Sequence, residues 1–148
     1  MSARLDYNQI DPKGSRALAG LRAYVEHSGL ERSLIDLINV RVSQVNGCAY
    51  CIRVHTEEAV EHGETHRRLH LLRVWPEGPF SARERAALRW ADAITHVNQA
   101  PVSDEVYAEV SEHFNDHDLV ALTYAAISMN AWNRLGIAFR KSDPALAE

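Results

Sequence analysis

One apolar pattern at helical spacing, which stops at an Asn46-Gly47 turn, restricts the fold of this chain more than any other feature. Within residues 31–46 the large apolar side chains recur at every third or fourth position, which is the spacing of one face of an α-helix. These side chains are Leu34, Ile35, Ile38, Val42 and Val45. Because Asn-Gly favours a turn, a second helix that starts at residue 48 can fold back along the first. The pattern therefore predicts a helical hairpin.

Turn-forming and helix-capping residues divide the rest of the chain into helices joined by short turns. Gly29 and Gly63 are typical helix ends, and Ser81 with Glu84 forms a capping-box pattern at the start of another helix. No run of Val, Ile and Thr alternates for long enough to predict a sheet. We therefore expect an all-α fold, a single-domain bundle of about seven helices over residues 1–148 with a core at about 31–62. The expected helices are 14–28, 31–46, 48–62, 64–74, 81–95, 103–113 and 116–139.

The composition is that of an ordinary globular domain. Apolar residues make up 46% of the chain, and the formal net charge is −4. An acidic balance argues against nucleic acid or an anionic membrane as a partner. No segment has the roughly 18 uninterrupted apolar residues of a membrane span, and the first residues lack the apolar core of a signal peptide. We therefore expect a cytoplasmic location.

The residues with the most specific chemistry are Cys48-Ala49-Tyr50-Cys51 and His55. Cysteines three positions apart at the start of a helix face the same way and can form a disulfide with little backbone movement. The helix N-terminus favours an anion there, which lowers a thiol pKa. His55 follows Cys51 by one helical turn and can accept its proton. The pattern predicts a redox-active disulfide at the N-terminus of a core helix.

Asp36 is the carboxylate that we expect to assist His55. It lies within a very apolar stretch of the preceding helix. Counted from the turn at 1.5 Å per residue, Asp36 is roughly 15 Å away, His55 roughly 10 Å and Cys51 roughly 5 Å. This order predicts a proton relay from thiol to imidazole to carboxylate, with Cys51, Cys48, His55 and Asp36 as catalytic residues.

These residues could also serve other roles. Cys48, Cys51 and His55 could hold a catalytic zinc, but a structural zinc needs a fourth ligand that no second CxxC supplies. Haem attachment is excluded because Ile52, not histidine, follows Cys51. His62, His66 and His70 recur every four residues, but Gly63 interrupts that stripe, so we predict a solvated surface. No nucleotide-binding loop is present. We therefore expect no metal and no cofactor.

The segment 34–56 as a whole resembles the core of the alkyl hydroperoxidase D-like (AhpD-like) group of the carboxymuconolactone decarboxylase superfamily. The similarity extends to residues 81–90 and 130–134. The resemblance implies an all-helical subunit that assembles into trimers or hexamers. It also implies a peroxidase in which the second cysteine, Cys51, attacks the peroxide and Cys48 closes the disulfide. Two positions depart from the family pattern, because Asp36 replaces a glutamate and Tyr50 replaces the histidine found between the cysteines of the best-known members.

Three functional interpretations follow. The leading one is a thiol-dependent peroxidase that acts on a peroxide substrate and is regenerated by an external dithiol or protein thiol. The second is a disulfide oxidoreductase without peroxidase activity, and the third is a non-enzymatic redox sensor. A homo-oligomer is also expected, because helices 31–46 and 116–139 are apolar over more of their circumference than one small bundle needs to bury.

Overall fold

The computed structural model describes residues 3–143, and every regular element in this range is helical. The helices are α1 (Tyr7–Ile10), α2 (Pro12–Glu26), α3 (Arg32–Asn46), α4 (Ala49–Glu61), α5 (His66–Leu71), the 3₁₀ helix η1 (Leu72–Glu77), α6 (Ala82–Thr95), α7 (Asp104–Ser111) and α8 (Asp116–Ala138). The predicted all-α class is thus confirmed. None of these helices has the length and apolar character that crossing a membrane requires.

Two details of the predicted helices were wrong. The short helix α1, whose N-terminus is capped by the Asp6 side chain, was not predicted, since four residues contain no full hydrophobic period. The expected helix 64–74 is instead two elements, α5 and η1, and η1 continues through Pro76. A 3₁₀ turn tolerates proline better than an α-helix because proline removes no i→i−4 hydrogen bond there.

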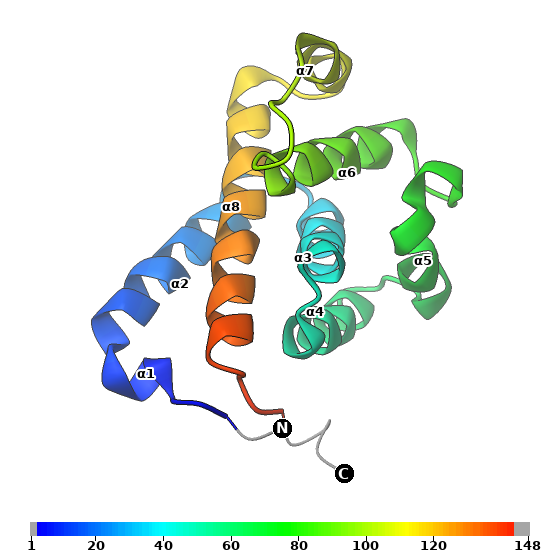
Figure 1. Cartoon of the computed structure of the whole chain (residues 1–148). Coiled ribbons are helices and arrows are strands. Elements are labelled where there is room, and N and C mark those ends of the chain that lie inside the picture. Colours follow the sequence, from blue (N-terminus) through cyan, green and yellow to red (C-terminus); the bar gives the residue numbers. More distant parts are fainter. Residues whose placement is uncertain (1–2, 144–148) are drawn as a thin grey trace.

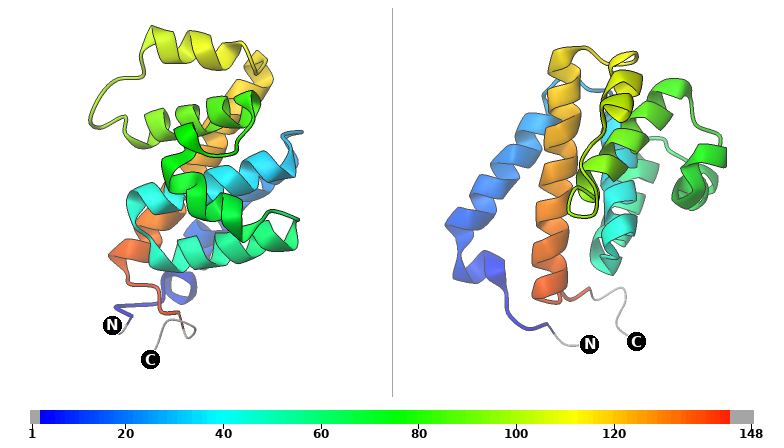
Figure 2. Two further views of the ribbon diagram at one scale, coloured as in Figure 1. Left: turned by 90° about the vertical axis from the view of Figure 1, so that its right-hand side faces the viewer. Right: turned by 45° about the horizontal axis from the view of Figure 1, so that its top comes forward.

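Two helices, α3 and α8, organise the bundle. Figure 1 shows α8 running through the middle of the molecule, with α2 on one side of it and α3 on the other. In both views of Figure 2, α4 runs back beneath α3, and α7 lies next to the N-terminal end of α8. The hairpin expected around Asn46-Gly47 is present. Gly47 ends α3 with a φ of 72°, a left-handed conformation that glycine adopts without steric cost.

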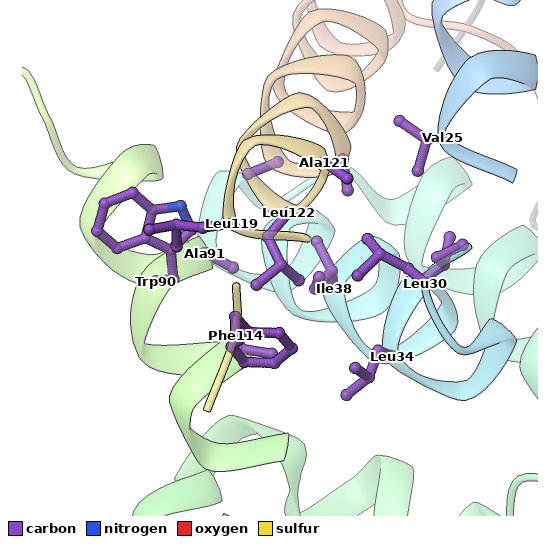
Figure 3. Packing of buried hydrophobic residues seen from close by; sticks show 14 of the residues in the cluster. Val25, Leu30, Leu34, Ile38, Trp90, Ala91, Phe114, Leu119, Ala121 and Leu122 are labelled. Carbon is purple, nitrogen blue, oxygen red and sulfur yellow. The ribbon is translucent and has the colours of Figure 1, made fainter. Parts of the chain in front are cut away.

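The hydrophobic core is split into two clusters by α3. The larger cluster lies between α2, α3, α6, α7 and α8, and Figure 3 shows Ile38, Leu122 and Phe114 near its middle. The smaller cluster joins the other side of α3 to α4, α5, η1 and α6. Because α3 is covered on both sides, its apolar circumference is already buried within one chain. By contrast, α8 leaves Val120, Tyr124 and Ile127 at least 40% exposed.

A hydrogen-bond network of polar side chains joins α3 to α8. The Asn133 side chain, which is fully buried, donates to Ser43 Oγ at 3.1 Å and accepts from Asn46 Nδ2 at 2.9 Å. Asn46 also donates to Asn130 Oδ1 at 3.0 Å. Buried amides of this kind stabilise a fold only when their partners are present. The network therefore fixes the register of α8 against the end of α3, next to the cysteines.

We predict that Asn133→Ala lowers the free energy of unfolding by about 2 kcal/mol, because Ser43 and Asn46 lose a buried partner. Urea denaturation of the oxidised protein measures this change. The control is Asn98→Ala, which removes an exposed amide and is expected to alter stability by less than about 0.5 kcal/mol. Equal stability of the two variants would show that the amide network contributes nothing to the fold.

Candidate active site

Cys48 and Cys51 form a disulfide at the N-terminus of α4. Cys48 is the N-cap residue, and its Sγ lies 3.3 Å from the backbone nitrogen of Cys51, so that this N–H points at the sulfur. Their Cα atoms are 5.3 Å apart, and the two residues are only 3% and 5% exposed. After reduction, the same N–H group and the helix dipole would stabilise a Cys48 thiolate.

The C-terminal part of α8 packs directly on the disulfide. A Cβ atom at Gly136 would lie 3.2 Å from the Cys48 sulfur and 3.6 Å from the Cys51 sulfur. Only glycine therefore allows α8 to approach this closely without displacing a sulfur atom. Gly136 was not among the residues singled out from the sequence, since nothing in its local pattern distinguishes it from any other helical glycine.

His55 belongs to a charged network that includes Glu58 and Arg22. His55 is buried, and its Nδ1 lies 2.8 Å from Glu58 Oε2. The guanidinium of Arg22, from α2, donates to both oxygens of Glu58 at 3.1 and 3.2 Å. The hydrogen bond from His55, together with the charges of His55 and Arg22, lowers the pKa of Glu58 to about 2 against the opposing effect of burial. Glu58 is therefore ionised at neutral pH and holds Nδ1–H, which leaves Nε2 as the nitrogen that can accept a proton.

The expected contact between Asp36 and His55 is wrong. Asp36 is buried, but its carboxylate pairs with His62 Nδ1 at 2.9 Å and with Arg32 Nε at 3.2 Å. The reason is geometric, because side chains tilt toward the N-terminus of their own helix. Asp36 leans away from the turn, whereas the side chains of α4 lean toward it. Asp36 thus meets His62, fifteen residues beyond Gly47, and clamps the far ends of α3 and α4 together.

A cavity of about 170 Å³ adjoins Cys51 and His55. Aromatic side chains from α1, α4 and α8 form much of its wall, and Lys141, from the segment after α8, also lines it. Its lining residues are Tyr7, Arg22, Tyr50, Cys51, Val54, His55, Trp132, Gly136 and Lys141. At roughly 30 Å³ per water molecule, this space admits a small organic molecule.

A second cavity, of about 370 Å³, adjoins Cys48. It is lined by the Gly47–Tyr50 segment and by residues between Gly136 and Asp143. Tyr50, Gly136 and Lys141 line both cavities. Cys51 therefore lines one cavity and Cys48 the other, and the two cavities share part of their walls.

A larger hollow, of about 1000 Å³, lies on another face of α4 and includes neither sulfur. His66 and His70 line it with ring centroids 6.4 Å apart, while His62 is taken by Asp36, so the three histidines do not form one cluster. Among the described residues no group of three or more His, Cys, Asp or Glu side chains is arranged to hold a metal ion. The candidate zinc ligands Cys48 and Cys51 are joined to each other instead.

Three further residues of the site escaped the sequence analysis. Glu58 follows His55 by three positions, and that helical spacing alone could have suggested the pair. Arg22 and Lys141 lie far from the cysteines in the sequence, so only the tertiary structure places them beside the site.

The chain is similar in sequence and in fold to known proteins. The model of the carboxymuconolactone decarboxylase family matches residues 12–93. The uncharacterised protein YdfG of Bacillus subtilis (strain 168) is 40% identical over 139 residues, which span 93% of this chain and 95% of YdfG.

Two solved structures have the same fold. ATU0492 of Agrobacterium tumefaciens, a protein of unknown function described as a candidate antioxidant defence protein AhpD, is 35% identical, with a TM-score of 0.93 over 97% of this chain and 99% of its own. The Debrominase Bmp8 is 18% identical, with a TM-score of 0.78 over 93% of this chain and 74% of its own. The second likeness is one of fold alone.

The ionised Glu58 predicts a specific dependence of stability on pH. Its pKa is ordinarily near 4.5 when the chain is unfolded and falls to about 2 in the folded protein. Its contribution to stability is therefore complete above about pH 4.5 and is lost as the pH falls toward 2. We expect Glu58→Gln to destabilise the protein at pH 7 by about 1 kcal/mol, after allowance for solvent screening, and the difference from wild type to shrink across this window.

Urea denaturation at several pH values between 2.5 and 7 measures the effect, with buffers of about constant ionic strength. Glu61→Gln, an exposed residue one turn further along α4, serves as the matched control and is expected to show no such dependence. A Glu58→Gln penalty that stays constant down to the acid end of the range would contradict the assigned pairing.

Proposed function

The chain belongs to the carboxymuconolactone decarboxylase family, and we propose that it is a thiol-dependent peroxidase that cycles through the Cys48–Cys51 disulfide. One observation carries the proposal. The buried disulfide borders two cavities, and the cavity beside Cys51 also contains His55, which Glu58 holds with one ring nitrogen available. This arrangement suits a small oxidant at Cys51 and a separate reductant at Cys48.

The first step oxidises Cys51. In the reduced protein, His55 Nε2 takes the proton of the Cys51 thiol, and Glu58 stabilises the imidazolium that results. The Cys51 thiolate attacks the terminal oxygen of the hydroperoxide, the O–O bond breaks, and a sulfur–oxygen bond forms. The departing alkoxide takes the proton back from His55 and leaves as the alcohol. Cys51 becomes a sulfenic acid, oxidised by two electrons, and the peroxide is reduced by two.

The second step joins the sulfurs. The Cys48 thiolate, stabilised at the N-cap of α4 by the Cys51 N–H group, attacks the sulfur of the sulfenic acid. The disulfide forms, and the hydroxyl group leaves with a proton as water. Each cysteine thus has its own source of activation, since His55 serves Cys51 and the helix N-terminus serves Cys48.

The third step needs an external dithiol. One of its thiolates enters the cavity beside Cys48, attacks that sulfur and releases Cys51 as a thiolate, which regains its proton. The second thiol then attacks the mixed disulfide, so that Cys48 is released and the reductant leaves as a disulfide. The dithiol thus supplies two electrons and two protons. These are the same numbers that reduction of the peroxide consumes.

The burial of both sulfurs favours a small oxidant over the disulfide of a folded protein. Cys48 and Cys51 are only 3% and 5% exposed, so neither residue lies where a folded partner could present its own disulfide. An oxidoreductase that acts on the disulfides of folded proteins is therefore the less favoured function, and the same burial favours a small dithiol over a protein thiol as the reductant. Assembly into trimers or hexamers remains a prediction, and the exposed apolar residues of α8 supply a surface for it.

We expect the purified protein to consume cumene hydroperoxide in the presence of excess dithiothreitol, and Cys51→Ser to abolish this turnover. Cys48→Ser should retain one stoichiometric reaction with peroxide and accumulate a sulfenic acid on Cys51, which dimedone labelling and mass spectrometry detect. A label on Cys48 in the Cys51→Ser protein, at the wild-type rate, would reverse the roles of the two sulfurs. Absence of peroxide consumption by the wild type under several dithiols would refute the peroxidase itself.

The two carboxylates, Glu58 and Asp36, are expected to differ in their effect on this reaction. Glu58→Gln should lower kcat/KM for hydroperoxide by about tenfold, because it removes the charge that stabilises the imidazolium. Asp36→Asn should leave kcat/KM within about twofold, because Asp36 acts as a clamp between helices, and should lower thermal stability instead. Steady-state kinetics and thermal unfolding of the two variants decide the matter. The opposite pattern would restore the relay that the sequence predicts.

A further inference from the structure

Lys141 lines the cavity beside Cys51 and lies close to two tyrosine rings. Its Nζ is 4.7 Å from the centroid of the Tyr50 ring and 5.5 Å from that of Tyr7. Tyr7 also contacts Phe139 ring to ring, and the Arg4 backbone donates to the Phe139 carbonyl, so that both ends of the described chain hold this arrangement. Figure 1 shows α1 and the segment after α8 at the same end of the molecule.

Lys141 differs from the charged side chains near it because it forms no ion pair with a carboxylate among the described residues. Arg22 is paired with Glu26 and Glu58, and His55 is paired with Glu58. In residues 3–143, by contrast, the Lys141 ammonium group contacts Tyr7 and Tyr50, and no Asp or Glu lines this cavity. Although burial acts to lower the pKa of Lys141, Tyr7 and Tyr50 raise it above its ordinary value, so the amine stays protonated.

Trp132 adds a third aromatic side chain to the lining of this cavity. The cavity thus combines three aromatic walls, from Tyr7, Tyr50 and Trp132, with an ammonium group that no carboxylate of the lining neutralises.

Resting on the proposed function, we propose that this cavity takes an organic hydroperoxide that carries a carboxylate, with Lys141 as the residue that selects it. The carboxylate accepts hydrogen bonds from Lys141, the organic group packs among Tyr7, Tyr50 and Trp132, and the peroxide end reaches Cys51 and His55. Charge-assisted hydrogen bonds are the strong ones, and a partly buried ammonium group favours an anion over a neutral analogue of the same shape. Lys141 is then a specificity-determining residue for the reaction.

A binding measurement tests the site without any need for turnover. Isothermal titration of the oxidised protein compares 4-isopropylbenzoate with the neutral 4-isopropylbenzyl alcohol. We expect the wild type to bind the carboxylate about tenfold more tightly, Lys141→Met to lose this preference and Lys141→Arg to keep part of it. Lys13→Met removes the same charge from an exposed position of α2 and should behave as wild type. Equal affinity for both compounds, or a preference that Lys141→Met leaves intact, would overturn the inference.

A kinetic measurement separates this inference from the proposed function. Cumene hydroperoxide and its para-carboxylate derivative differ only in the anionic group. A roughly tenfold higher kcat/KM for the derivative than for cumene hydroperoxide, and a ratio of the two that falls to about one in Lys141→Met, support the inference. Turnover of both compounds at equal rates would leave the peroxidase standing and refute the selectivity. Carboxylate-selective binding without turnover of either would refute the peroxidase and leave the carboxylate site standing.

Discussion

The close contact between α8 and the Cys48–Cys51 disulfide is the constraint on which the site depends. Gly136 provides the space for it, since any side chain there would meet a sulfur atom. The buried amide of Asn133 and the half-buried amide of Asn46 hold α8 in the required register. At this contact α8 lies against both sulfurs, and Gly136 lines the cavity beside Cys51 as well as the one beside Cys48.

Two groups of charged side chains that involve α4 have different tasks. Arg22, Glu58 and His55 connect α2 to the CxxC helix and end at the cavity beside Cys51. Asp36 and His62 are at the far end of the same helix pair and close it. Both groups pair a carboxylate with a histidine, but only one histidine lies next to a sulfur. The position of each carboxylate–histidine pair along the hairpin, and not its residue types, therefore decides whether the pair is suited to chemistry at the disulfide or only stabilises the helix pair.

In the proposed reaction the two cavities serve the two sulfurs separately. The cavity of about 170 Å³, with its aromatic walls, would take the organic peroxide beside Cys51, and the cavity of about 370 Å³ would take the thiol beside Cys48. Lys141 belongs to both linings and lies close to Tyr7 and Tyr50. The Debrominase Bmp8 has the same fold at 18% identity, so the fold by itself does not determine which reaction is catalysed. The reaction depends on the side chains around the sulfurs.

The sequence by itself determined the helical class, most helix boundaries and the cysteine–histidine register, because these depend on spacings of three and four residues within one helix. It could have suggested Glu58 for the same reason. It misassigned Asp36, because the partner of a side chain across a hairpin depends on the tilt and offset of two helices, which no single-helix periodicity contains. The contributions of Arg22, Gly136 and Lys141 were decided only by the tertiary structure. They come from α2, α8 and the segment after α8, and packing alone brings these parts of the chain to the disulfide.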